Sequence, residues 1–289
     1  MKILKTIVGY SCVFVALTGV VFLITGWGLP QIQEHETSFQ IALPSVVQHV
    51  SASEPTRPTS ESSETSQETT EETTSQTTTS PPDESGLPAG NPSDWNLVLI
   101  NRQHPMTNFD VDLVTLPNGL QLDRRIVPYW DKLYEAAKQA GISLTMVSAF
   151  RSVATQQALI QQNIQQNINS GMNEEDARAA TMRVMQDPKT SEHTSGLAFD
   201  VVGTDYFNRT PSDQLLTANF ANDPSAKWLA ENAARFGFIL RYPQNRFDIT
   251  GIDFEPWHFR FVGIPAAEYI KAHNITLEEY IEMLSKAGR

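Results

Sequence analysis

The chain has 289 residues, of which 40% are hydrophobic and 19% are charged, and its formal net charge is -12. A chain of this length holds one large domain or two small ones. The acidic balance, without a basic patch interleaved with aromatic residues, argues against nucleic acid as a partner.

The N-terminal segment has the composition of a membrane anchor. Lys2 and Lys5 precede a mostly apolar run over residues 7–27 that contains no charged residue. About 20 apolar residues suffice for a helix to cross a bilayer core of roughly 30 Å. A cleaved signal peptide starts in a similar way, but this run is longer than a signal peptide needs, and residues 26–30 lack an A-x-A-like cleavage site. We therefore expect an uncleaved anchor over residues 1–30, with the rest of the chain outside the cell by the positive-inside rule.

A long polar segment follows the anchor. Residues 51–92 consist mainly of Ser, Thr, Glu, Gln and Pro, with seven glutamates and one aspartate against one arginine. Such a composition buries too little apolar surface to offset the entropy of the chain. We therefore predict a disordered linker over residues 31–92 that tethers a folded domain over residues 93–289. The single cysteine, Cys12, lies in the apolar run, so the folded domain has no disulfide and depends on its core, or partly on a metal.

The folded part mixes helices and strands without regular alternation. We predict strands at residues 96–100, 142–148, 197–202 and 238–242, and helices at residues 126–140, 152–169, 173–186, 225–236, 265–272 and 276–286. Ser152 and Asn173 are expected helix N-caps, and Gly141 follows the first helix. Because β-α-β units and internal repeats are both missing from this order, the sequence predicts an α+β domain with a small, mainly antiparallel sheet flanked by helices.

Two short clusters contain the residue types of a metal site. His193 and Asp200 lie seven positions apart, with Gly196 between them, at the entry to the predicted strand. This spacing differs from the helical H-E-x-x-H motif, in which two histidines share one helix face. The second cluster adds Glu255 and His258. We infer a catalytic zinc site with His193, Asp200 and His258 as ligands and one position open for water.

Glu255 is the expected general base of this site, because a fourth protein ligand would close the metal to water. In a regular strand, Glu255 and His258 would point to opposite faces, since they are three positions apart. Pro256, between them, also disfavours a continuous strand. We therefore predict a turn or bulge at Pro256 and Trp257 that brings both side chains to the metal, with Trp257 packed beneath the site.

The two clusters resemble a known family, the VanY-like D-alanyl-D-alanine carboxypeptidases, which are zinc peptidases of bacterial cell-wall peptides. The matching runs are Ser191-x-His193-x-x-Gly196-x-Ala198-x-Asp200 and Glu255-x-Trp257-His258, with residues 236–243 as a further family-like run. The fold relatives of this family include lysostaphin-type peptidases and the hedgehog signalling domain. The resemblance implies Zn²⁺ as cofactor, peptidoglycan stem peptides as substrate, and the ligand and base roles given above.

The same resemblance extends to residues 148–156. It implies that Arg151 orients the substrate and stabilises the oxyanion, and that Gln156 and Ser191 help hold the C-terminal end of the substrate. We also expect Trp257 to contact the substrate. Ala149 and Phe150 stand where the family has glycine and tyrosine. These two departures change details of substrate contact but remove no metal ligand.

Other functions fit the same residues. An L,D-carboxypeptidase that trims tetrapeptide stems would use the same zinc chemistry, and an endopeptidase would cut cross-bridges. A non-catalytic wall-binding module, as on the hedgehog branch, is disfavoured by the intact Glu255. The anchor, the linker and the cysteine usage together predict a cell-surface protein of Gram-positive type, held in the membrane by its N-terminal helix, with a monomeric extracellular catalytic domain.

Overall fold

The computed structural model describes residues 86–107 and 110–289. The predicted anchor lies outside this part of the chain, as does the predicted linker up to residue 85. Leu87, which falls inside the predicted linker, is buried in a hydrophobic cluster with residues of the C-terminal helices. In the described ranges, no helix is both long enough and apolar enough to cross a membrane.

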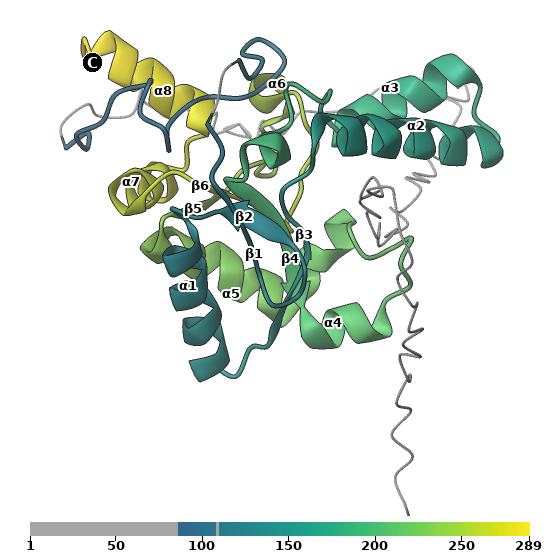
Figure 1. The fold of residues 1–289 in the computed structure, drawn as a ribbon, viewed down its shortest axis with the longest axis horizontal. Helices are drawn as coiled ribbons and strands as arrows, with labels where there is room; N and C mark the ends of the chain where they lie inside the picture. The colour runs from purple at the N-terminus through teal and green to yellow at the C-terminus, as the bar shows by residue number, and fades with distance from the viewer. Residues whose placement is uncertain (1–85, 108–109) are drawn as a thin grey trace, which may run out of the picture. The chain divides into compact units, whose positions relative to one another are not determined.

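A four-stranded antiparallel sheet lies at the centre of the described domain (Figure 1). Its strands, in spatial order, are β3 (Leu144–Ser148), β4 (Ala198–Gly203), β6 (His258–Phe261) and β5 (Phe238–Leu240). A second, two-stranded antiparallel sheet pairs β1 (Leu113–Thr115) with β2 (Gln121–Asp123). The predicted α+β class with a small antiparallel sheet is therefore confirmed.

Helices make up most of the remaining regular structure. The α-helices of the described ranges are α1 (Val127–Gln139), α2 (Val153–Asn169), α3 (Glu174–Val184), α4 (Thr204–Arg209), α5 (Pro224–Asn232), α6 (Phe247–Thr250), α7 (Ile264–His273) and α8 (Leu277–Lys286). Three 3₁₀ turns accompany them in the same ranges: η1 (Glu192–Ser195), η2 (Ala218–Asn222) and η3 (Ala233–Phe236). The helix predicted at residues 225–236 therefore consists of α5 followed directly by η3.

Local sequence signals set several helix ends. The Ser152 hydroxyl accepts a hydrogen bond from the backbone N–H of Thr155 and caps α2. The Asn173 side chain accepts one from the backbone N–H of Asp176 and caps α3. Both caps satisfy backbone donors that have no partner inside the first helical turn. The two N-caps predicted from the sequence are confirmed.

The two faces of the sheet differ because side chains alternate along a strand. Phe199 of β4 and Phe259 and Phe261 of β6 are almost completely buried in the main hydrophobic core. The Phe199 ring packs edge-on against Trp130 of α1, with ring centroids 4.9 Å apart, and against Phe238 of β5, at 5.1 Å. The residues next to these phenylalanines along each strand point to the opposite face of the sheet. That face can therefore carry polar groups.

Helices α2 and α3 form a hairpin beside the sheet (Figure 1). Ile160 and Ile164 of α2 pack with Ala177 of α3 and with Met185, in a cluster separate from the main core. The hairpin is therefore stabilised largely by contacts between its own helices.

The strand predicted at residues 96–100 is wrong. The backbone turns at this point, because the N–H of Val98 donates to the carbonyl oxygen of Asp94 at 3.0 Å. The carbonyl oxygens of Asn96 and Val98 accept hydrogen bonds from Arg260 Nη2, at 3.2 and 2.8 Å. A buried arginine thus satisfies backbone groups that a neighbouring strand would otherwise satisfy.

We predict that Phe199→Ala destabilises the domain by about 3–5 kcal/mol, because it leaves a cavity between α1 and the sheet. Phe207 of α4 is 41% exposed and provides the matched control. Phe207→Ala should change the free energy of unfolding by no more than about 0.5 kcal/mol. Urea unfolding of both variants measures the difference, and equal losses would contradict the assignment of Phe199 to the core.

Candidate active site

Asp200 and His258 lie directly opposite each other on the neighbouring strands β4 and β6. Residues opposite each other in an antiparallel pair point to the same face of the sheet. The Oδ1 atom of Asp200 lies 3.0 Å from Nδ1 of His258. The next pair along the strands is Phe199 and Phe259, whose side chains enter the main core. The sheet register therefore places both polar side chains on the face opposite the core.

His193 reaches the same place from the short turn η1. Gly196 ends this turn with φ of +69°, and a Cβ atom at that position would lie 2.9 Å from the backbone nitrogen of Asp123. Only glycine fits both the left-handed conformation and the close approach. His193 Nδ1 lies 2.7 Å from the carbonyl oxygen of Ala149, at the end of β3, and Nε2 lies 3.4 Å from Asp200 Oδ2.

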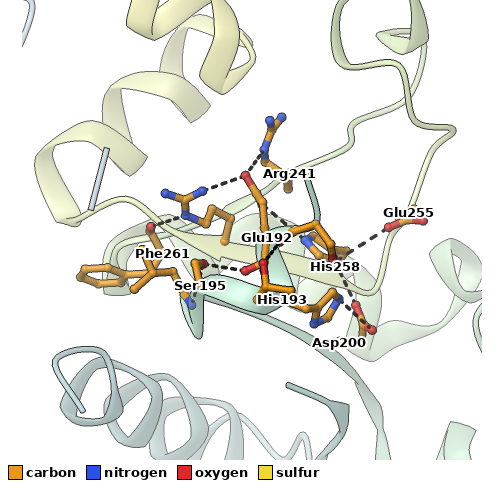
Figure 2. A network of polar contacts seen from close by, with 12 residues as sticks. Glu192, His193, Ser195, Asp200, Arg241, Glu255, His258 and Phe261 are labelled. Atoms are coloured by element: carbon orange, nitrogen blue, oxygen red, sulfur yellow. Dashed lines mark hydrogen bonds and ion pairs between the residues drawn. The ribbon is translucent and has the colours of Figure 1, made fainter. Parts of the chain in front are cut away.

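The structure thus brings the three predicted ligands together. One potential ligand atom from each of His193, Asp200 and His258 lies within 4.8 Å of the other two, and all three side chains are buried. Figure 2 shows the two imidazoles and the carboxylate converging. Because the Nδ1 hydrogen of His193 is used by the Ala149 carbonyl, the lone pair of Nε2 is free for a metal. Two imidazoles and one carboxylate match the donor set of a catalytic zinc site.

Glu255 stands beside this cluster because of a tight turn. The backbone N–H of His258 donates to the carbonyl oxygen of Glu255 at 3.2 Å, which closes a turn over Pro256 and Trp257. The turn brings Glu255 Oε2 to 3.8 Å from His258 Nδ1, so both side chains face the same point. The predicted turn is therefore confirmed. Burial raises the pKa of Glu255 to about 8, although the nearby His258 acts in the opposite direction.

The two imidazoles differ in their electrostatic surroundings. Burial, together with the positive charge of Arg151, lowers the pKa of His193 to about 4. Burial also acts to lower the pKa of His258, but the interactions of its ring with the carboxylates of Asp200 and Glu192 outweigh burial and raise that pKa to about 9. Burial acts to raise the pKa of Asp200, but the two imidazoles outweigh burial and hold this pKa far below its usual range. The carboxylate of Asp200 is therefore ionised at neutral pH.

The predicted substrate-contacting residues surround a cavity of about 70 Å³ at this cluster. Arg151, Gln156, Ser191 and Trp257 all line it. Arg151 Nη2 lies 4.0 Å from Asp200 Oδ2, and Nε of this guanidinium has no hydrogen-bond partner in the described part of the chain. The Gln156 side chain is buried in the wall, where Nε2 donates to a backbone carbonyl at 2.9 Å. Trp257, predicted beneath the site, forms part of the cavity wall.

A larger groove of about 750 Å³ adjoins this cavity. The two share Val184, Leu216 and Trp257 as lining residues. The groove also presents charged groups, among them Arg183 and Asp213. An elongated ligand could therefore place one end beside the metal ligands and the remainder in the groove.

Sequence reasoning missed a buried charge cluster behind the metal ligands. Glu192, Arg241 and Arg260 are all at most 1% exposed and are joined by ion pairs of 2.8 Å. Glu278, at the start of α8, pairs with Arg241 at 2.7 Å. Glu192 directly precedes the ligand His193, and that adjacency is the one sequence signal that could have drawn attention to it.

Comparison with known proteins adds to this geometry. The family model described as "VanY: D-alanyl-D-alanine carboxypeptidase" matches residues 119–264, which include all the ligands and Glu255. A D-alanyl-D-alanine carboxypeptidase of Enterococcus faecalis (strain ATCC 700802 / V583) is 37% identical over 193 residues, covering 66% of this chain and 68% of that protein.

Solved structures are similar to 65% of the chain. A VanY D,D-pentapeptidase mutant from a VanB-type vancomycin resistance cassette, in complex with Zn(II), is 36% identical with a TM-score of 0.58, covering 65% of this chain and 99% of that one. VanYB in complex with D-alanine-D-alanine has the same identity and TM-score, with 65% and 98% covered. The L,D-carboxypeptidase LdcB is 29% identical with a TM-score of 0.54, with 65% and 86% covered. With its His-Asp-His cluster and adjoining glutamate, this chain belongs to the VanY family of zinc-dependent D-alanyl-D-alanine carboxypeptidases.

Proposed function

We propose that this enzyme removes the terminal D-alanine from peptidoglycan stem peptides that end in D-alanyl-D-alanine. The observation that carries the proposal is the buried carboxylate of Glu255 beside the three converging ligands, with its Oε2 atom 3.8 Å from His258. A non-catalytic binding module would need the three metal ligands, but it would not need Glu255, an acidic side chain that is not one of them. The relative VanYB, solved with D-alanine-D-alanine, supports the choice of substrate end.

Three side chains would hold the metal: His193 through Nε2, His258 through Nδ1, and Asp200 through its carboxylate. Bound there, Zn²⁺ supplies Lewis acidity for the scissile carbonyl and makes a water molecule acidic enough to act as the nucleophile. The surrounding side chains are buried, so competing water is largely excluded from the ligand cluster. The protein contributes the fixed ligand geometry and the handling of protons.

Glu255 is the residue placed to move protons. In its ionised form, the carboxylate takes a proton from the attacking water, and it then gives that proton to the departing amine of the terminal residue. Burial raises its pKa to about 8 in the metal-free protein, so this carboxyl group is a stronger base than an exposed glutamate. A base with a pKa near the working pH can accept and return a proton in one cycle.

Arg151 is placed to stabilise negative charge on the substrate. Its guanidinium lies at the cavity wall 4.0 Å from Asp200, with Nε unpartnered among the described residues. A fixed cationic donor in a buried site stabilises a developing oxyanion strongly. Ser191 and Gln156 line the same cavity and are positioned to contact the C-terminal end of the substrate.

The departures from the family pattern leave the metal site intact. Ala149 replaces the usual glycine, but its contribution to the site is the backbone carbonyl that accepts a hydrogen bond from His193. That interaction does not depend on the side chain. Phe150 in place of tyrosine removes one hydroxyl group, so any effect of this change falls on substrate contact.

The location of the enzyme is part of the proposal. The charged start and the long apolar run before residue 30 support a membrane anchor, and the polar segment before residue 86 supports a tether. A tether of this kind would let a monomeric catalytic domain reach stem peptides outside the membrane. The groove of about 750 Å³ beside the cavity supports a substrate longer than a dipeptide.

Glu255→Gln should bind zinc as the wild type does and lower kcat by about 10²–10⁴-fold, because the amide can neither accept nor return the proton. Zinc content is measured by atomic absorption and turnover by release of D-alanine. The matched control is Glu268→Gln on the exposed side of α7, which should retain wild-type turnover. Near-normal turnover in Glu255→Gln would remove this residue from the mechanism.

The substrate assignment is tested by incubating the enzyme with pentapeptide stems, tetrapeptide stems and free D-alanyl-D-alanine. We expect the pentapeptide to lose one alanine and the other two to react slowly, since the groove favours the longer stem that carries the D,D bond. Mass spectrometry identifies the products. Preferred trimming of the tetrapeptide would instead establish an L,D-carboxypeptidase, and cleavage of cross-linked stems would establish an endopeptidase.

A chelator should abolish turnover, and added zinc should restore it.

A further inference from the structure

Glu192 lies behind the metal ligands. Among the described residues, one of its carboxylate oxygens is hydrogen-bonded and the other has no hydrogen-bond partner. Its Oε1 atom accepts hydrogen bonds from Arg241 Nε and from Arg260 Nη1, both at 2.8 Å. Its Oε2 atom has no hydrogen-bond partner in the described ranges and lies 3.5 Å from Nε2 of His258, which is also unpartnered there. Figure 2 shows Glu192 between Arg241 and the His258 ring.

The two ring nitrogens of His258 therefore face different groups. Nδ1 faces the ligand cluster, 3.0 Å from Asp200 Oδ1 and 3.8 Å from Glu255 Oε2. A neutral imidazole that ligates a metal through Nδ1 carries its hydrogen on Nε2. Ligating histidines donate this second N–H to a carboxylate or a backbone carbonyl, which fixes both the tautomer and the orientation of the ring. His193 already follows this rule with the carbonyl of Ala149.

The arginines hold the Glu192 carboxylate in place. Arg260 is completely buried and also donates to the carbonyl oxygens of Val98, at 2.8 Å, and Phe261, at 3.0 Å. Arg241, equally buried, donates to both carboxylate oxygens of Glu278, at 2.9 and 2.7 Å. Since each guanidinium is fixed on its far side as well, Oε1 cannot leave the arginines without breaking two buried hydrogen bonds. Oε2 is thereby directed at His258.

We propose that Glu192 is a positioning residue of the zinc site: it accepts the Nε2 hydrogen of His258 and so selects the tautomer that presents Nδ1 to the metal. The inference rests on the proposed function, because it requires zinc at His193, Asp200 and His258. It assigns no direct contact with substrate or metal to Glu192. The buried arginines serve this role by keeping one carboxylate oxygen occupied and the other available.

Glu192→Gln provides a specific test because the two ends of the amide are not equivalent. Arg241 and Arg260 both donate to the site of Oε1, so the amide must place its carbonyl oxygen there and its NH₂ group toward His258. Nε2 of His258 then becomes the acceptor and the hydrogen moves to Nδ1, the nitrogen that zinc needs. The substitution therefore favours the wrong tautomer with almost no change in side-chain volume.

We expect Glu192→Gln to weaken zinc binding by about 10- to 100-fold, the usual effect of losing such a partner of a ligating histidine. The Kd for zinc is measured on the full-length protein by competition with a chelator. Glu278→Gln is the matched control, since it removes the same charge from the same buried cluster without touching His258, and the amide oxygen that remains still accepts a hydrogen bond from Arg241. Both variants should lose thermal stability, but Glu278→Gln should keep the Kd of the wild type.

An unchanged Kd in Glu192→Gln, or an equal weakening in Glu278→Gln, would overturn the inference and leave Glu192 a structural residue. A wild-type protein that binds no zinc would instead overturn the proposed function. Should Glu192→Gln fail to fold, ¹⁵N NMR of the zinc-loaded wild type decides the matter. The expected spectrum shows the His258 hydrogen on Nε2 and protected from exchange, and zinc bound through Nε2 would contradict the assignment.

Discussion

The pairing of β4 with β6 is the constraint on which the site depends. The register that places Asp200 opposite His258 also places Phe199 opposite Phe259, so one alignment serves both the site and the core. A shift of one residue would move the carboxylate into the hydrophobic core and a phenylalanine to the metal site. Burial of the phenylalanines therefore holds the metal ligands in register. The free energy that fixes the positions of Asp200 and His258 therefore comes largely from hydrophobic burial on the opposite face of the sheet.

Burial of charge is the second feature that shapes the site. Asp200, Glu255 and Glu192 are all nearly inaccessible to solvent, and such carboxylates are costly unless they are paired. Two arginines compensate Glu192, and the pKa of its carboxyl group is held far below the usual range, although burial acts in the opposite direction. Glu255 has only weaker neighbours, and burial raises its pKa. The surroundings thus lower the pKa of Glu192 and raise the pKa of Glu255, although both residues lie close to metal ligands in the sequence.

The same groups explain which parts of the architecture the sequence predicts. The helices with clear caps, such as those begun by Ser152 and Asn173, depend on contacts within a few residues, and such contacts are visible in the sequence. The turn over Pro256 is also local, since proline restricts both its own backbone and that of Glu255. His193 and His258 are far apart in the chain, and their convergence could be inferred because each lies in a short run of residues that is typical of a metal site.

The failures arise from contacts that are distant in sequence and have no repeating pattern. The segment at residues 96–100 has the composition of a buried strand, but Arg260 occupies its carbonyl oxygens. A buried arginine is rare enough that composition alone argues against it. Glu192 was overlooked for a related reason, because its partners Arg241 and Arg260 follow it by 49 and 68 positions. From sequence alone, charged residues are expected at the surface, and only the fold shows which of them are buried with a partner.

The walls of the cavity come from two separately packed parts of the domain. The sheet and the turn before β6 provide Asp200, His258 and Glu255, the groups with chemical roles. Gln156 lies on α2, in the hairpin that has its own hydrophobic cluster, and Val184 ends α3 at the boundary between the cavity and the groove. Substitutions in the hairpin can therefore reshape the substrate side of the cavity while the register of β4 and β6 is preserved.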